Sequence, residues 1–257
     1  MMQQVLISLS SFGAAQVRRH GQPWFTRLAQ QAGADGVEVR SELLVDPATE
    51  LPAIARAVRA WGAPVVYSSA EPLWGPDGTL DFAAVQRAVD AARLLGAARL
   101  KMSIGDARGA SRGDLRRLAE SVGGVELLIE NDQTAGAGTV DALQAFFRAA
   151  EEAGSPLAMT FDMGNWHWAG EEPLDAARTF AARVRYVHCK GVQQHGRRWG
   201  AVPLADSAAP WRAVLRALPR GLPWAIEYPL VGDDLLQTTR GEIAQLREAS
   251  ARLGAFA

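Results

Sequence analysis

The chain has 257 residues, of which 48% are hydrophobic and 21% are charged, and its net charge at pH 7 is -1. This composition is typical of a globular protein with a sizeable core, and it excludes a disordered chain. Lys and Arg (27) nearly balance Asp and Glu (28), so no global electrostatic attraction draws the protein toward nucleic acid or an anionic membrane. We therefore expect neither as a partner.

The start of the chain and its cysteine content bear on where the protein acts. The opening segment MMQQVLISLSSF lacks the basic start of a secretion signal, and Ser8 and Ser10 interrupt its apolar run. No segment approaches the roughly 20 apolar residues that a transmembrane helix requires. The single cysteine, Cys189, has no partner for an internal disulfide, which fits a reducing compartment. We therefore expect a cytoplasmic protein.

Short apolar segments rich in branched residues recur along the chain, and each has the length of a strand. Their centres lie roughly thirty residues apart, which is the size of a βαβ unit. The predicted strands are VLISLS from Val5, DGVEV from Asp35, PVVYSS from Pro64, RLKMSI from Arg99, VELLIE from Val125, LAMTFD from Leu157, VRYVHC from Val184 and PWAIEY from Pro223.

Segments with helical periodicity lie between these strands. The segment after Asp81, a predicted N-cap, repeats apolar residues every three or four positions and stops at Gly96. Eight alternating units predict one (β/α)8 TIM barrel, a single domain over residues 1–257. An open doubly wound sheet is the alternative. Such a sheet is expected to carry a GxGxxG motif after its first strand, whereas this sequence has SSFGAAQ there.

The carboxyl ends of the last four predicted strands carry ionisable residues. The active site of a parallel barrel forms at these ends. The strands end in the motifs LLIEND, MTFDMGN, RYVHCKG and WAIEYP. The residues of interest in them are Glu130, Asp162, His188 and Glu227.

Each of these four residues follows several apolar residues, which predicts a buried position where an unpaired charge costs several kcal/mol. A divalent cation compensates three carboxylates best. Three carboxylates and one imidazole suit Mn²⁺ or Mg²⁺, and the set lacks the thiolates of a structural zinc site. We therefore predict one divalent metal ion, with Mn²⁺ preferred and Mg²⁺, Co²⁺ or Zn²⁺ as alternatives. Salt bridges around the barrel mouth are the competing interpretation.

With these motifs the chain resembles the xylose isomerase-like barrel superfamily, in particular the sugar phosphate isomerase/epimerase group that includes D-tagatose 3-epimerase and hydroxypyruvate isomerase. The Glu of LLIEND, the Asp of FDMGN, the His of YVHCKG and the Glu of AIEYP correspond in order to that family's four metal ligands. GADGVEV around Glu38 also looks like the family's second strand.

The resemblance implies a small-molecule sugar substrate, which could be a sugar phosphate or a keto-sugar acid. It implies a metal that polarises the substrate carbonyl and so makes the neighbouring C–H bond more acidic. Glu130 and Glu227 are then the catalytic acid/base pair, in which one removes the proton and the other returns it. Return to the opposite face of a cis-enediolate gives epimerisation, and return to the adjacent carbon gives isomerisation.

Further residues are predicted to contact the substrate. Lys190 lies two positions after His188, hence on the same side of the strand, where it can hold a hydroxyl, carboxylate or phosphate. Asn165 stands where the related epimerases commonly carry His, and His167 is its predicted substitute. The other predicted contacts are Trp166, Glu38, Lys101 and, in the polar loop QQHGRRWG, Arg197. For these residues a salt bridge, rim packing or a solvated loop is the alternative.

Rival functions stay open at this point. The same metal and base could expel a β-hydroxyl, which makes a metal-dependent dehydratase the main alternative. An endonuclease IV-like phosphodiesterase shares the superfamily, but it resembles a three-metal enzyme that needs several more histidines than the four in this chain. A binding protein on an inactive barrel is disfavoured because all four ligand positions are filled. The oligomeric state is also open, with a homodimer as one option.

Overall fold

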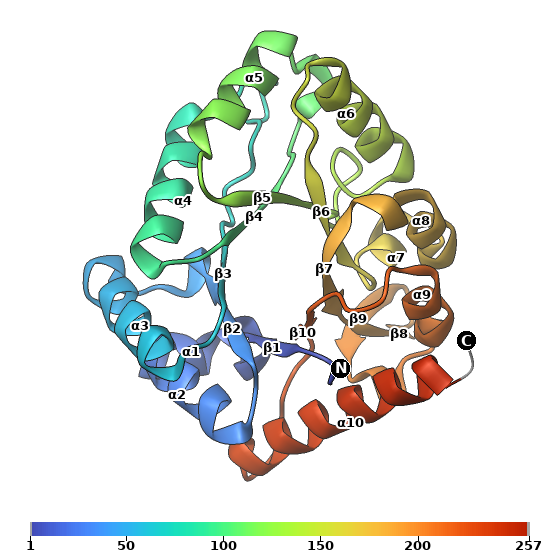
Figure 1. Ribbon diagram of the computed structural model, residues 1–257. Coiled ribbons are helices and arrows are strands. Elements are labelled where there is room, and N and C mark those ends of the chain that lie inside the picture. Colours follow the sequence, from blue (N-terminus) through green and yellow to red (C-terminus); the bar gives the residue numbers. More distant parts are fainter. Residues whose placement is uncertain (1, 256–257) are drawn as a thin grey trace.

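The computed structural model describes residues 2–255, and Figure 1 shows a ring of strands enclosed by helices. Within these residues, eight parallel strands close a barrel in the order β1-β10-β7-β6-β5-β4-β3-β2. The predicted TIM barrel is therefore confirmed. Its strands are β1 (Val5–Ser8), β2 (Gly36–Arg40), β3 (Val65–Ser68), β4 (Arg99–Ser103), β5 (Glu126–Glu130), β6 (Ala158–Asp162), β7 (Val184–Cys189) and β10 (Trp224–Ile226).

The barrel interior is packed in layers. A small apolar cluster fills its centre and consists of Leu6, Val66, Leu128, Tyr186 and Ala225. Side chains two positions apart point to the same side of a strand, so the next inward-facing residues lie one layer closer to the carboxyl ends. These residues are Ser8, Ser68, Glu130 and His188 on four of the strands, and Glu227 directly after β10. A polar layer thus rests on an apolar plug that closes the barrel below it.

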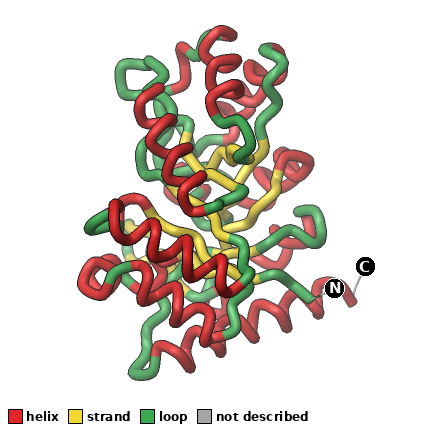
Figure 2. Tube along the Cα trace, turned by 60° about the vertical axis from the view of Figure 1, so that its left-hand side comes forward, coloured by secondary structure: helices red, strands yellow, loops and turns green. Residues whose placement is uncertain are grey.

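The larger part of the core lies between the outer faces of the strands and the helices, where Val37, Ile129 and Phe161 are fully buried. Figure 2 shows the helices in red around the yellow strands. The helices are α1 (Ala14–His20), α2 (Gln22–Ala32), α3 (Pro47–Trp61), α4 (Phe82–Leu95), α5 (Arg112–Ser121), α6 (Val140–Glu152), α7 (Trp166–Ala169), α8 (Pro173–Phe180), α9 (Trp211–Ala217) and α10 (Leu235–Ala255).

Local capping sets the ends of these helices. The side chain of Asp81 accepts a hydrogen bond from the backbone of Ala84, and Gly96 adopts a left-handed conformation directly after α4. The predicted start and stop of this helix are thus confirmed. The last helix, α10, packs beside α2 and completes the outer layer. Among the helices of residues 2–255, none has both the length and the apolar character needed to cross a membrane.

The segment after β7 differs from the prediction. The sequence QQHGRRWG, interpreted as a polar loop, lies mostly in an antiparallel hairpin of β8 (Gly191–His195) and β9 (Arg198–Val202). The interpretation was wrong because the turn signal was overlooked. Gly196 has a φ of +62° at the first position of a two-residue turn, and a type II′ hairpin turn requires positive φ there.

The first and last strands are also shorter than predicted. β1 ends at Ser8, and the residues that follow form the 3-10 helix η1 (Leu9–Phe12). β10 ends at Ile226, so Glu227 follows the strand directly. The remaining 3-10 turns are η2 (Ser41–Leu43), η3 (Ala107–Gly109), η4 (Ala181–Arg183) and η5 (Leu204–Asp206).

Candidate metal centre

The four predicted ligand residues converge at the carboxyl ends of four neighbouring strands. Glu130 ends β5, Asp162 ends β6, His188 is the fifth residue of β7, and Glu227 follows β10. Asp162 and His188 are register partners in adjacent strands. One ligand atom from each of the four residues lies within 4.8 Å of the others. The structure thus brings together one imidazole and three carboxylates.

The position of His188 Nδ1 tests whether this set fits a cation. The nitrogen lies 2.8 Å from Glu227 Oε2, 2.9 Å from Glu130 Oε1 and 3.8 Å from Asp162 Oδ2. A proton on Nδ1 can serve only one of these oxygens at a time, and the contact with Glu227 is the shortest. Among the described residues, Glu130 Oε1 is buried and has no hydrogen-bond partner.

An unpaired buried carboxylate oxygen is costly, whereas a divalent ion can interact with all four groups at once. Oxygen ligands with one imidazole are a set that Mn²⁺, Mg²⁺ or a similar ion accepts. Glu130, Asp162, His188 and Glu227 therefore fit a metal ion on the chemistry of their donors.

In each of the three carboxylates, one oxygen is held by a neighbouring group of the protein and the other faces the centre of the four-residue cluster. Glu130 Oε2 pairs with Lys101, and Glu227 Oε1 accepts a hydrogen bond from Arg40. Asp162 Oδ1 accepts from the backbone N–H groups of Gly164 (2.8 Å) and Asn165 (2.9 Å). The second oxygen of each carboxylate faces the centre. The cluster is preorganised because these contacts lock the ligand side chains before an ion binds.

Lys190 lies at the edge of the same cluster. Its Nζ is 2.6 Å from Asp162 Oδ2 and 2.9 Å from Glu227 Oε2. The stem of Lys190 crosses directly over Gly164, where an added Cβ would approach the lysine carbons to 2.8 Å. A larger residue at position 164 would therefore displace the lysine from the carboxylates.

Burial and neighbouring charges act in opposite directions on the pKa values of the cluster. Burial acts to raise the pKa of Glu130, but Lys101 and His188 together lower it to about 2. Burial likewise opposes ionisation of Glu227, yet His188 and Lys190 hold its pKa well below the usual range. Burial raises the pKa of Asp162. For His188, burial disfavours the charged ring, but Glu227 and Glu38 raise its pKa well above the ordinary value.

The residues predicted to contact substrate divide into those at the cluster and those away from it. Lys101 and Glu38 are fully buried, pairing with Glu130 and His188 respectively. Asn165 accepts from Lys190 (3.1 Å) and donates to the backbone oxygen of Asn131 (2.9 Å). Asn165 therefore supports the lysine and the segment that directly follows β5.

The aromatic and hairpin residues lie further out. Trp166 is fully buried and packs against Phe161 and Phe180 in the core. The His167 ring packs on Trp199 of the hairpin with 4.7 Å between centroids, and burial lowers its pKa. Arg197 lies in the exposed hairpin turn.

Arg40 contacts the four-residue cluster, and sequence reasoning missed it. It ends β2 and contacts Glu227, Glu38 and Glu42. The signal was available, because Arg40 is an ionisable residue at the carboxyl end of a strand, as the four ligand residues are. The predicted second strand stopped at Val39, one residue too early.

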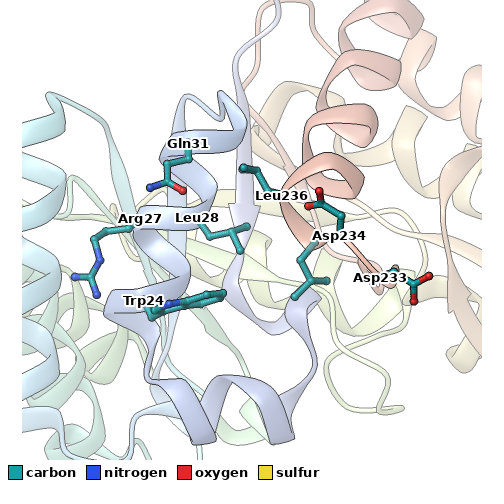
Figure 3. A pocket seen from close by; sticks show the side chains of 8 residues that line it. Trp24, Arg27, Leu28, Gln31, Asp233, Asp234 and Leu236 are labelled. Carbon is teal, nitrogen blue, oxygen red and sulfur yellow. The ribbon is translucent and has the colours of Figure 1, made fainter.

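A separate hollow of about 560 Å³ lies on the outer surface, between α2 and the start of α10 (Figure 3). It contains none of the predicted ligand or substrate-binding residues. Its lining consists of Trp24, Arg27, Leu28, Gln31, Asp233, Asp234, Leu235 and Leu236. The candidate site is therefore identified by its converging buried charges and not by the size of a hollow.

Comparison with known proteins is consistent with this architecture. A family model described as "Xylose isomerase-like TIM barrel" matches residues 26–249. L-ribulose 3-epimerase is 17% identical, with a TM-score of 0.74, and the match covers 99% of this chain and 96% of that chain. D-allulose 3-epimerase from Methylomonas sp. is 15% identical, with a TM-score of 0.71 and coverage of 96% and 98%.

A further structural neighbour has a different activity in its name. AsbF from Bacillus anthracis, a probable 3-DHS dehydratase involved in petrobactin synthesis, is 14% identical, with a TM-score of 0.69 and coverage of 95% and 98%. No curated protein sequence matches the chain. At these identities the structural likeness establishes the shared fold, and the chemistry has to be argued from the cluster itself.

Proposed function

Because the chain belongs to the xylose isomerase-like TIM barrel family, we propose that it is a divalent-metal-dependent sugar isomerase or epimerase. The observation that carries the proposal is the buried cluster of one imidazole and three carboxylates, with ligand atoms within 4.8 Å of one another. Two structural neighbours are named as sugar 3-epimerases, which supports the same reaction class. We propose Mn²⁺ as the ion, with Mg²⁺, Co²⁺ or Zn²⁺ as alternatives.

The reaction needs two groups that exchange a carbon-bound proton from different sides of the substrate. Glu130 and Glu227 suit this role because β6 and β7 separate their strands in the ring. The two carboxylates therefore approach the centre of the cluster from different directions. When bound, the metal ion supplies the positive charge that polarises the substrate carbonyl.

Both carboxylates are held in the form that accepts a proton. Lys101 holds Glu130 through one oxygen, and Arg40 holds Glu227 through one oxygen. In each residue the other oxygen is directed to the reaction centre, where a positioned carboxylate contributes about 10²–10⁴-fold to the rate of proton transfer. One carboxylate takes the proton from the substrate carbon and thereby becomes a carboxyl group. In isomerisation this carboxyl group returns the proton to the neighbouring carbon, whereas in epimerisation the other glutamate takes up a proton from solvent and donates it to the opposite face of the original carbon.

Two analyses of the purified protein test this function. Metal analysis should find about one divalent ion per chain, in line with a single cluster of this kind. Incubation with a panel of keto-sugars in D₂O should then replace one carbon-bound hydrogen of the sugar by deuterium. The sugar should not lose a water molecule. The variant Glu130→Gln should abolish exchange, whereas Glu126→Gln, at the exposed opposite end of β5, should retain it. A metal-free protein, or a panel without any exchange, would contradict the proposal.

A dehydratase is the second candidate, favoured by the likeness to the B. anthracis protein. In that reaction the same base removes a proton, but the substrate then expels a hydroxyl group instead of receiving the proton back. The product would have lost one water molecule. Mass spectrometry of the reaction mixture distinguishes this product from an isomer, which keeps the mass of the substrate.

A further inference from the structure

Glu38 contacts the predicted metal ligand His188 from across the barrel. It lies on β2, which β1 and β10 separate from β7 in the ring of strands. Its side chain is fully buried, and its Oε2 lies 2.7 Å from His188 Nε2. The contact is therefore a buried hydrogen bond between strands that are not neighbours.

The other oxygen of Glu38 faces a hydroxyl group and two cations. Oε1 lies 3.3 Å from both Ser8 Oγ and Arg40 Nη1, and 3.9 Å from Lys101 Nζ. These groups compensate the negative charge of Glu38 and favour its ionised form. An ionised carboxylate can only accept hydrogen bonds, so Nε2 of His188 is the atom that carries the proton in this contact.

Contacts with Glu38 and Tyr186 fix the orientation of the His188 imidazole. The ring of Tyr186, one layer below, packs edge-on against the ring of His188 with 5.2 Å between centroids. With Nε2 held by Glu38, Nδ1 is directed at the oxygens of Glu130 and Glu227, 2.9 and 2.8 Å away. When the Nδ1 proton leaves, the lone pair that a metal ion needs is therefore on the nitrogen that faces the carboxylates.

We propose that Glu38 is a positioning residue for the metal centre: it keeps a proton on Nε2 of His188 and so presents Nδ1 to the ion. The inference rests on the proposed function, because it assumes a metal ion at this cluster. It assigns Glu38 an action through His188, in place of the substrate contact that the sequence suggested. Such outer partners of a histidine ligand set its tautomer and raise its basicity.

The substitution Glu38→Gln tests the proposal without changing the shape of the side chain. The amide oxygen should turn toward Arg40, Ser8 and Lys101, because these groups donate hydrogen bonds. The amide NH₂ then faces Nε2 of His188 and favours the opposite tautomer, with the proton on Nδ1. We expect Mn²⁺ binding, measured by isothermal titration calorimetry, to weaken about 10–100-fold.

The control variant is Glu50→Gln. Glu50 is also a buried glutamate, but it accepts hydrogen bonds from the backbone N–H groups of Gln22, Val45 and Asp46. The variant should bind Mn²⁺ as tightly as the wild type, even if its melting temperature falls. Equal weakening in both variants would mean that a general loss of stability is responsible, and it would overturn the role of Glu38.

A measurement on the wild type keeps the test valid if Glu38→Gln does not fold. In ¹⁵N-histidine-labelled protein loaded with diamagnetic Zn²⁺, the His188 signal should show a protonated Nε2 and a metal-bound Nδ1. His188→Ala identifies that signal among the four histidines. A metal-bound Nε2 would overturn the proposal for Glu38 and leave the metal site standing. Absence of metal binding by the wild type would overturn the proposed function as well.

Discussion

The two sides of the barrel contribute different things to the cluster. The strands β5, β6, β7 and β10 supply the four predicted ligand residues, whereas β2 and β4 supply Glu38, Arg40 and Lys101, which contact those ligands. The side chains on both sides are buried or nearly so. A buried ionisable residue on the inner side of the barrel can therefore be a ligand or a support, and its contacts decide which.

The largest effect is expected on the ligand side. Glu130→Gln keeps the shape of the side chain but removes a group that accepts the substrate proton, so the turnover rate should fall about 10²–10⁴-fold. Initial rates on the best sugar of the exchange panel measure this loss. Glu126→Gln, on the same strand and exposed, is the matched control. An equal loss of activity in both variants would contradict a specific role of Glu130.

On the supporting side, Lys101→Met should mainly reduce stability. It leaves the carboxylate of Glu130 without its nearest cation, and breaking a buried ion pair costs about 3–5 kcal/mol of unfolding free energy. Arg99→Met on the same strand breaks the more exposed pair with Glu126 and should cost only about 0–1 kcal/mol. Urea denaturation of the metal-free proteins gives both values, and similar losses would refute the distinction.

Metal binding to the ligand side should stabilise the folded protein. An ion that binds only the folded protein adds about 2.7 kcal/mol of stability at a concentration 100 times its dissociation constant. Thermal unfolding with Mn²⁺ and with a chelator should therefore show a higher melting temperature for the loaded wild type. Asp162→Asn removes a ligand charge and should abolish most of this difference. A full shift in that variant would exclude Asp162 as a ligand.

The smallest effect is expected outside the cluster, in the hairpin turn. Arg197→Ala should change stability by no more than about 0.5 kcal/mol, as exposed substitutions usually do. A rise in KM with an unchanged kcat would support its predicted contact with substrate. Gly196→Ala, at the neighbouring position with a φ of +62°, should cost about 1–3 kcal/mol because that conformation is strained for alanine. Thermal melts of both variants give the comparison.

Much of the fold followed from patterns that act over short distances. Apolar segments at a spacing of one βαβ unit predicted the eight barrel strands, because buried parallel strands are apolar on both faces. Alternation along a strand also predicts the layer above the apolar plug, as with Leu128 and Glu130 on β5. The hairpin after β7 was missed because its polar residues hid a glycine turn.

By itself the sequence determined the barrel and placed Glu130, Asp162, His188 and Glu227 at one end of it, because strand alternation and connection length are local properties of the chain. Only the tertiary structure decided which charges meet across the barrel. Glu38 and His188 are 150 residues apart, and their hydrogen bond exists because closure of the ring brings the interior faces of distant strands together. The same closure pairs Arg40 with Glu227, which no spacing in the sequence encodes.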